Sequence, residues 1–171
     1  MADVAADAGV AVQTVYFTFH TKAELLRACF ERAVLGEEDP LPPQLQPFWR
    51  AMLEAGSGEE AIGHFVRGNA AIVQRVARLA NVVAATTHEP DAVAIWTRSE
   101  ELRRAGYREA VQHVESRFGL RKGLSAEKAT DILLTLGSAA PYVALVVEYG
   151  WTHEAYLDWA TGALSHMLLS R

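Results

Sequence analysis

Hydrogen-bonding side chains gather in a short stretch near the start of the chain. Gln13, Thr14 and Tyr16 are close neighbours, and Lys22 follows shortly after them. Residues 8–23 contain no carboxylate. Amides and hydroxyls of this kind can contact base edges and the sugar–phosphate backbone, lysine binds phosphate, and a surface that faces phosphates must be free of acidic side chains. The stretch therefore has the chemistry of a nucleic-acid contact.

The surrounding sequence predicts that these side chains are held on a short helix. Residues 3–8 are rich in alanine and predict a first short helix, and Gly9 suits the left-handed conformation that ends one. A second short helix then carries the polar residues. Thr21 and Glu24 predict a capping box at the start of a long helix that ends at Leu35. The apolar anchors of the two short helices are expected to be Val10, Val15 and Phe19. Two short helices joined by a tight glycine-containing turn form the helix-turn-helix pattern, whose second helix enters the major groove of DNA.

The segment AADAGVAVQTVYFTFHTKAELL also resembles the signature of the TetR family of bacterial transcriptional regulators. The resemblance rests on AGV at the turn, Thr14 and Tyr16 in the second helix, Phe19 after it and Lys22 at the next helix. It implies that Gln13, Thr14, Tyr16 and Lys22 contact double-stranded operator DNA, the last two mainly through phosphates. The segment PYVALVVEYGWTHEAYLDWATGALSHML is similar to the C-terminal end of an actinobacterial-type subgroup of the same family.

One departure from the family pattern keeps a second interpretation open. Members of the family have a full helix before this motif, whereas this sequence starts at Met1, inside the first helix of the motif. The alternative is a ligand-binding helical dimer that does not bind DNA because that helix is missing. A third, less favoured, reading is a helical carrier or enzyme.

Composition limits the other classes of function. The chain has 171 residues, a net charge of −5 and one cysteine, Cys29, which argues against non-specific coating of nucleic acid and against a disulfide framework or a thiolate metal site. The six histidines are scattered, and no HExxH, GxSxG, P-loop or GxGxxG motif occurs. We therefore expect no catalytic residues, no metal and no cofactor. Without a signal peptide or a long apolar run, the expectation is a cytoplasmic protein that does not enter a membrane.

Helical periodicity extends through the remaining sequence, so the predicted fold class is all-α. Residues 1–35 form the head and its linking helix, and residues 36–47, which hold four prolines, form a connector. Residues 48–171 form a body for ligand binding and dimerisation. Beyond a short helix near residues 48–53, the body is expected to contain four long helices, over residues 59–87, 89–118, 126–149 and 152–170.

Polar residues interrupt the apolar stripes of these helices. Asn69 falls on a buried stripe and needs hydrogen-bond partners, either from a neighbouring helix or water or from a ligand that it orients. Glu100 and Arg103 interrupt the next stripe and are interpreted as an ion pair or as surface residues rather than as a wet pocket wall. A pocket for a small apolar or aromatic ligand would be lined by Phe65, Asn69, Trp96, Tyr107, Thr135 and Tyr142.

The two C-terminal helices carry the remaining expectations. Pro141 should kink the helix over residues 126–149 and leave the carbonyl of Gly137 without its usual partner. That helix is apolar on two sides, which favours a subunit interface, and pairing with the helix over residues 152–170 predicts a four-helix dimer interface. The sequence thus predicts a homodimeric repressor that is released from a palindromic operator by its ligand.

Overall fold

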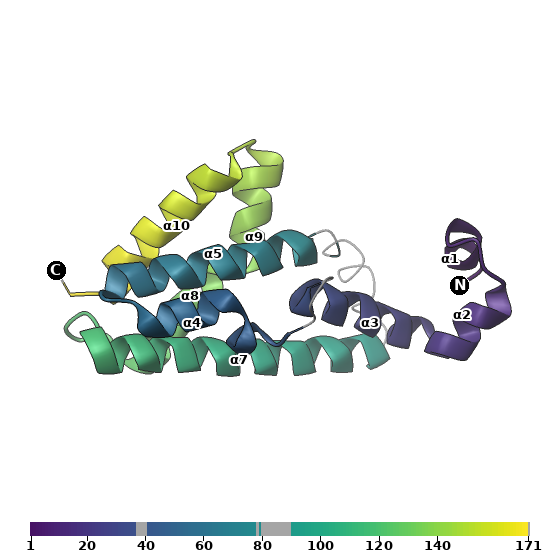
Figure 1. The fold of residues 1–171 in the computed structure, drawn as a ribbon, viewed down its shortest axis with the longest axis horizontal. Helices are drawn as coiled ribbons and strands as arrows, with labels where there is room; N and C mark the ends of the chain where they lie inside the picture. Colours follow the sequence, from purple (N-terminus) through teal and green to yellow (C-terminus); the bar gives the residue numbers. More distant parts are fainter. Residues whose placement is uncertain (37–40, 78, 80–89, 171) are drawn as a thin grey trace.

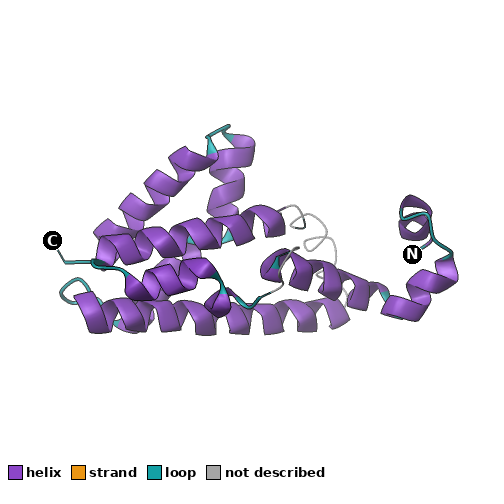
Figure 2. Cartoon of the chain, viewed as in Figure 1, coloured by secondary structure: helices purple, strands orange, loops and turns teal. Residues whose placement is uncertain are grey.

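All regular structure in residues 1–36, 41–77, 79 and 90–170, the part of the chain described by this computed structural model, is helical (Figure 2). The head and its linking helix comprise α1 (Ala2–Asp7), α2 (Val12–Phe19) and α3 (Lys22–Leu35). The body comprises η1 (Pro43–Leu45), α4 (Pro47–Glu54), α5 (Gly58–Ala77), α7 (Pro90–Phe118), α8 (Ala126–Leu136), α9 (Ala139–Tyr142), η2 (Val143–Glu148) and α10 (His153–Leu168). The all-α fold class is confirmed.

The molecule is elongated, with the head at one end (Figure 1). Helices α1 and α2 lie beyond the N-terminal end of α3, away from the helices of the body. Helix α3 packs on α5 and α7, whereas α1 packs on α2. The head is therefore carried on one helix whose other end packs on the body.

The core of the body forms where α4, α5, α7, α8 and α10 meet. Helix α10 contributes Tyr156, Ala160, Leu164 and Leu168, which recur every four residues and are at most 2 % exposed. Met52 of α4 is fully buried. This spacing places one continuous apolar stripe of α10 against α5 and α8, as the periodicity of the sequence indicates.

Helices α4 and α5 approach so closely that one position between them must be glycine. A Cβ added to Gly68 of α5 would lie 1.9 Å from Cγ of Phe48, whose ring therefore sits directly on the glycine backbone. Trp49 continues the contact, with its ring 6.2 Å from that of Phe65. A glycine in the middle of a helix is intrinsically unfavourable, and here it is explained by this aromatic packing.

Four helix starts have a serine or threonine cap. The hydroxyls of Thr21, Ser57, Ser125 and Thr152 each accept a hydrogen bond from the backbone N–H three residues later, at 3.1, 3.2, 3.3 and 3.1 Å respectively. The reciprocal half of the capping box at α3 differs from the prediction. The N–H of Thr21 donates to the carbonyl of Phe19, which belongs to the preceding helix, rather than to the carboxylate of Glu24.

The predicted long helix over residues 126–149 is interrupted just before Pro141 rather than kinked by it. Helix α8 ends at Leu136, and α9 begins at Ala139, so Pro141 is the third residue of a new helix. A proline there costs no hydrogen bond, because the first-turn N–H groups of a helix have no intrahelical partner. The prediction of a kink within a continuous helix is therefore wrong.

The stretch Ala126–Glu148 is long and apolar enough to span a membrane, judged by length and composition alone. Core helices of soluble proteins meet the same two criteria.

The helix expected over residues 59–87 is described as Gly58–Ala77, and its predicted end falls on residues 80–89, which with residue 78 lie outside the described part of the chain. The connector over residues 36–47 contains a single turn of 3-10 helix, Pro43–Leu45, and Pro47 already opens α4. Pro43 opens η1 and Pro47 opens α4. These prolines explain where the two helices begin, since the fixed φ of proline suits a helix N-terminus.

Candidate functional site

The turn between α1 and α2 is closed by two backbone hydrogen bonds around a glycine. Gly9 has φ +65°, its N–H donates to the carbonyl of Ala6 at 3.2 Å, and the N–H of Val10 donates to the carbonyl of Ala5 at 3.0 Å. This pair of bonds is the Schellman motif, which requires a left-handed residue after the helix and favours glycine there. The motif fixes the angle at which the second helix leaves the first.

One side of α2 is buried and the other is free. Val15 is 5 % exposed and packs in the small interior of the head, where Ala5 of α1 is also buried. The predicted DNA-contacting residues Gln13, Thr14 and Tyr16 are exposed together on the remaining surface. Val10, which the sequence suggested as an anchor, is 44 % exposed and contributes little to that interior.

The start of α3 lies next to this surface, and its first turn carries Lys22 and, two residues later, Glu24. Lys22 is the first residue of α3, is exposed, and follows the capping residue Thr21. The unpaired N–H groups and the macrodipole at a helix N-terminus favour an anion. Lys22 adds a full positive charge at the same place. The four predicted DNA-contacting residues therefore combine hydrogen-bonding groups on α2 with a phosphate-compatible helix start.

The opposite end of α3 is fixed to the body through its last carbonyls. Nε of Arg75, on α5, donates to the carbonyl of Ala33 at 2.7 Å, and Nη2 of the same side chain donates to the carbonyl of Val34 at 3.4 Å. The amide of Gln46 donates to the carbonyl of Leu35 at 3.3 Å. These carbonyls have no partner within the helix, so the arginine and the glutamine act as a C-terminal cap supplied by other elements.

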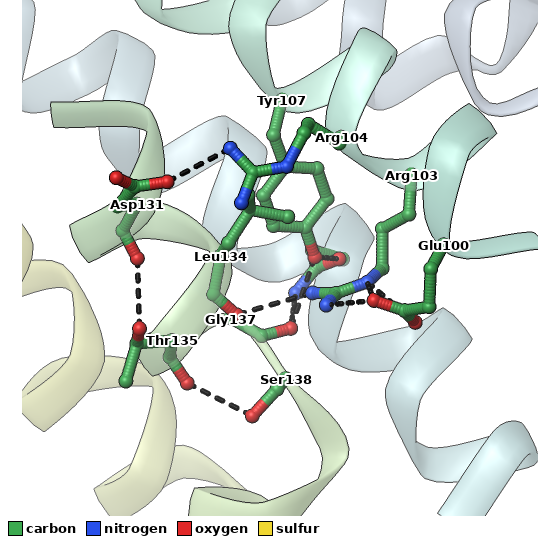
Figure 3. Close-up of polar contacts among 10 residues, drawn as sticks. Glu100, Arg103, Arg104, Tyr107, Asp131, Leu134, Thr135, Gly137 and Ser138 are labelled. Carbon is green, nitrogen blue, oxygen red and sulfur yellow. Dashed lines mark hydrogen bonds and ion pairs between the residues drawn. The ribbon is translucent and has the colours of Figure 1, made fainter. Parts of the chain in front are cut away.

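Inside the body, a buried cluster of polar groups surrounds the break between α8 and α9. Nδ2 of Asn69 donates to the carbonyl of Gly137 at 2.8 Å. The hydroxyl of Tyr107 lies 2.9 Å from the same carbonyl and also hydrogen-bonds Oδ1 of Asn69 (Figure 3). The predicted loss of the helical partner of Gly137 is confirmed, and two side chains from α5 and α7 replace it. The buried Asn69 is satisfied by neighbouring helices, one of the readings left open by the sequence.

Tyr107 is the member of this cluster whose chemistry is most altered by its surroundings. The side chain is 7 % exposed, and its ring packs edge-on against Phe65 at 5.0 Å. Burial disfavours the charged phenolate and raises the pKa of Tyr107 to about 12. The hydroxyl therefore stays protonated across the physiological range and acts there as a hydrogen-bond donor.

An ion pair extends the cluster toward the surface. Nη2 of Arg103 lies 2.5 Å from Oε2 of Glu100, and Nη1 of Arg103 donates to the carbonyl of Leu134 at 3.1 Å (Figure 3). The guanidinium carbon is also 5.4 Å from the ring centre of Tyr107. The ion pair predicted between Glu100 and Arg103 is confirmed. Its arginine provides a further donor to the carbonyls at the end of α8.

Four of the six side chains predicted to line a ligand pocket are buried in the core of the body, and two are not. Phe65, Asn69 and Tyr107 come together in the buried cluster at the end of α8. The ring of Tyr142 packs on Tyr156 at 4.9 Å, and its hydroxyl is 3.1 Å from Nδ1 of His153. Trp96 and Thr135 do not join them. The indole is 41 % exposed and packs edge-on against Phe30 of α3 at 5.8 Å, and the threonine hydroxyl is exposed and donates to the carbonyl of Asp131.

The body holds a small apolar cavity next to Phe65. Its volume is about 10 Å³, close to the space that one water molecule needs. The lining side chains include Met52, Ile62, Phe65, Val111, Leu133 and Leu168. A cavity of this size holds no aromatic ligand, so a ligand in this part of the body would have to separate the surrounding helices.

Phe17 is an exposed residue of α2 that sequence reasoning did not assign to a site. Its side chain is 84 % exposed, the largest value among the large hydrophobic residues of the described chain. It follows Tyr16 and lies one helical turn after Gln13, a spacing that could have placed it on the candidate contact surface.

Comparison of the chain with protein-family models, with curated proteins and with solved structures finds no match. Function must therefore be inferred from the motif and its geometry.

Proposed function

We propose that the protein is a TetR-like transcriptional regulator, a repressor that binds palindromic operator DNA as a homodimer and is released by a small apolar or aromatic ligand. The observation that carries the proposal is the exposed face of α2. It presents Gln13, Thr14 and Tyr16 after a Schellman turn, in a segment without carboxylates and beside Lys22. Placed in a major groove, this helix would contact base edges while Lys22 neutralises a phosphate.

The proposed dimer would form through residues 126–149 and 152–170. Support comes from apolar side chains that remain exposed at the end of the first segment and just before the second, namely Val147, Tyr149 and Trp151. Exposed apolar side chains that fall close together in the sequence favour a partner surface over solvent. A two-fold axis there would present two copies of α2 to two half-sites, and their spacing would set the spacing of the operator.

The proposed release mechanism uses two residues in the C-terminal half of α5. Asn69 of this helix bonds the break after α8, and Arg75 bonds the end of α3. A ligand that separates the helices around Tyr107 would displace α5, and α3 with the head would follow. Such a ligand would favour the conformer whose heads do not match the operator, and would lower DNA affinity by the ratio of its affinities for the two conformers.

DNA binding can be tested with two lysines at opposite ends of the molecule. Lys22 opens α3 beside the head, whereas Lys122 lies in the loop between α7 and α8 at the far end of the body. Lys22→Ala and Lys122→Ala remove the same charge. Binding to a palindromic duplex from upstream of the gene is measured by fluorescence anisotropy at several salt concentrations. We expect Lys22→Ala to weaken binding and to reduce the salt slope by about 1 per protomer, and Lys122→Ala to leave both unchanged.

Tyr16→Ala provides the second arm, because the tyrosine is exposed and its loss should leave the fold intact. Equal affinity of Tyr16→Ala and the unmodified chain would contradict the assignment of α2. If the protein forms a stable dimer but binds neither the selected duplex nor other DNA at low salt, the ligand-binding dimer without DNA affinity becomes the better description.

A further inference from the structure

The most exposed large hydrophobic side chain in the described structure belongs to the candidate recognition helix. Phe17 is 84 % exposed, whereas Tyr16 beside it is 49 % exposed and Val15 is 5 % exposed. An exposed phenylalanine keeps a large apolar surface in water with no polar group to compensate. On a helix whose free face is otherwise polar, such a residue calls for an apolar partner outside the chain.

The neighbours of Phe17 define what that partner can be. Gln13 lies one turn before it and Thr14 three residues before it, so the three side chains share one face of α2. Thr18 is exposed too, but its hydroxyl donates to the carbonyl of Thr14 at 2.9 Å and is engaged within the helix. The face therefore presents one amide, one free hydroxyl and an aromatic ring.

The major groove offers one apolar group, the C5 methyl of thymine. The amide of a glutamine is suited to the N6 and N7 atoms of adenine. A phenylalanine ring has no donor for a phosphate, and thus its contribution to binding would come from burying apolar surface against a base. On the basis of the DNA-binding function proposed above, we propose that Phe17 packs against a thymine methyl in each half-site, next to an adenine contacted by Gln13.

The test removes the methyl from the DNA and the ring from the protein. A palindromic site is selected from a randomised duplex pool with the full chain. Each thymine of the half-site is then replaced in turn by deoxyuridine, which lacks only the methyl, and affinity is measured for the unmodified protein and for Phe17→Ala. At one position, we expect the loss of the methyl to weaken binding of the unmodified protein about fourfold per half-site, the factor expected for burying one methyl group. Phe17→Ala should be insensitive at that position.

Phe17→Leu serves as the matched variant, because it keeps an apolar side chain and should retain part of the methyl dependence. Thermal unfolding of all three proteins checks the fold, and the exposure of the side chain predicts equal midpoints. The proposal is overturned if no thymine position is sensitive, if Phe17→Ala keeps the same sensitivity, or if Phe17→Ala lowers the midpoint, since the ring would then have a partner within the chain.

The outcomes also separate this inference from the proposed function. DNA binding that depends on Tyr16 and Lys22 but not on any thymine methyl overturns the role of Phe17 alone. Failure of the unmodified protein to select any DNA sequence overturns both.

Discussion

Removal of the Tyr107 hydroxyl is the most direct test of the buried cluster at the end of α8. In Tyr107→Phe the carbonyl of Gly137 keeps its bond from Nδ2 of Asn69, but Oδ1 of Asn69 loses its donor. Asn69 is 8 % exposed, so this oxygen cannot turn to bulk water. An unsatisfied buried acceptor costs about 1–3 kcal/mol, so we expect a loss of about 2 kcal/mol and a fall in Tm of about 4–8 °C.

The pH dependence of the same variant tests the same reasoning independently. The pKa of Tyr107 is raised to about 12 by burial, above the usual tyrosine value of about 10. Between these values the unfolded chain ionises this tyrosine while the folded chain keeps it neutral, so stability falls as pH rises by about 1.4 kcal/mol per pH unit. Tyr107→Phe removes this loss. The stability difference between the two proteins should therefore shrink between pH 9 and pH 11 on the order of 1 kcal/mol.

The assay is urea denaturation of both proteins at a series of pH values, followed by circular dichroism. Asn69→Leu is a useful companion, because there the hydroxyl of Tyr107 still donates to the carbonyl of Gly137, and the polar penalty should be smaller than in Tyr107→Phe. An unchanged free energy of unfolding for Tyr107→Phe at pH 8, or a difference that stays constant up to pH 11, would refute the role assigned to the Tyr107 hydroxyl.

Four further substitutions, one of them a control, test other contacts. Gly68→Ala should cost about 1–3 kcal/mol, because the new Cβ meets the ring of Phe48, whereas Gly162→Ala, with open space around its Cβ, should be neutral or stabilising by about 0.5–1 kcal/mol in denaturation. Arg75→Met should increase hydrogen exchange at the C-terminal end of α3 without reducing that of α10, because it removes two bonds to the carbonyls of Ala33 and Val34. Leu164→Ala should cost about 2–5 kcal/mol by calorimetry, since the side chain is 1 % exposed, and a cost below 1 kcal/mol would contradict its place in the core.

Local sequence signals account for much of the fold. Periodicity predicted the long helices, and the capping residue Thr21 located the start of α3. These signals work because they act over three or four residues, the range of one helical turn. The ion pair between Glu100 and Arg103 was predictable for the same reason, since the two residues are three apart on one helix.

The break after α8 could not be placed in the same way. Proline marks a discontinuity, but its position depends on which carbonyl can find donors from outside the helix. Asn69 and Tyr107 supply them at Gly137, and they are 68 and 30 residues away in the sequence. The separation of Trp96 from Tyr107 has a similar origin, because the indole packs on Phe30 of α3. Both outcomes depend on which distant helices pack together. The pattern of residues within a single helix does not determine those partners.

The hydrogen bonds of α5 give this helix a mechanical role. Asn69 and Arg75 are six residues apart, a distance of about 9 Å along a helix axis, and between them the helix behaves as a stiff rod. One end of the rod is attached to the interruption after α8 and the other to the carbonyl end of α3. The direction in which the head points is thus tied to the interior of the body through α5, and not only through the chain that connects α3 to α4.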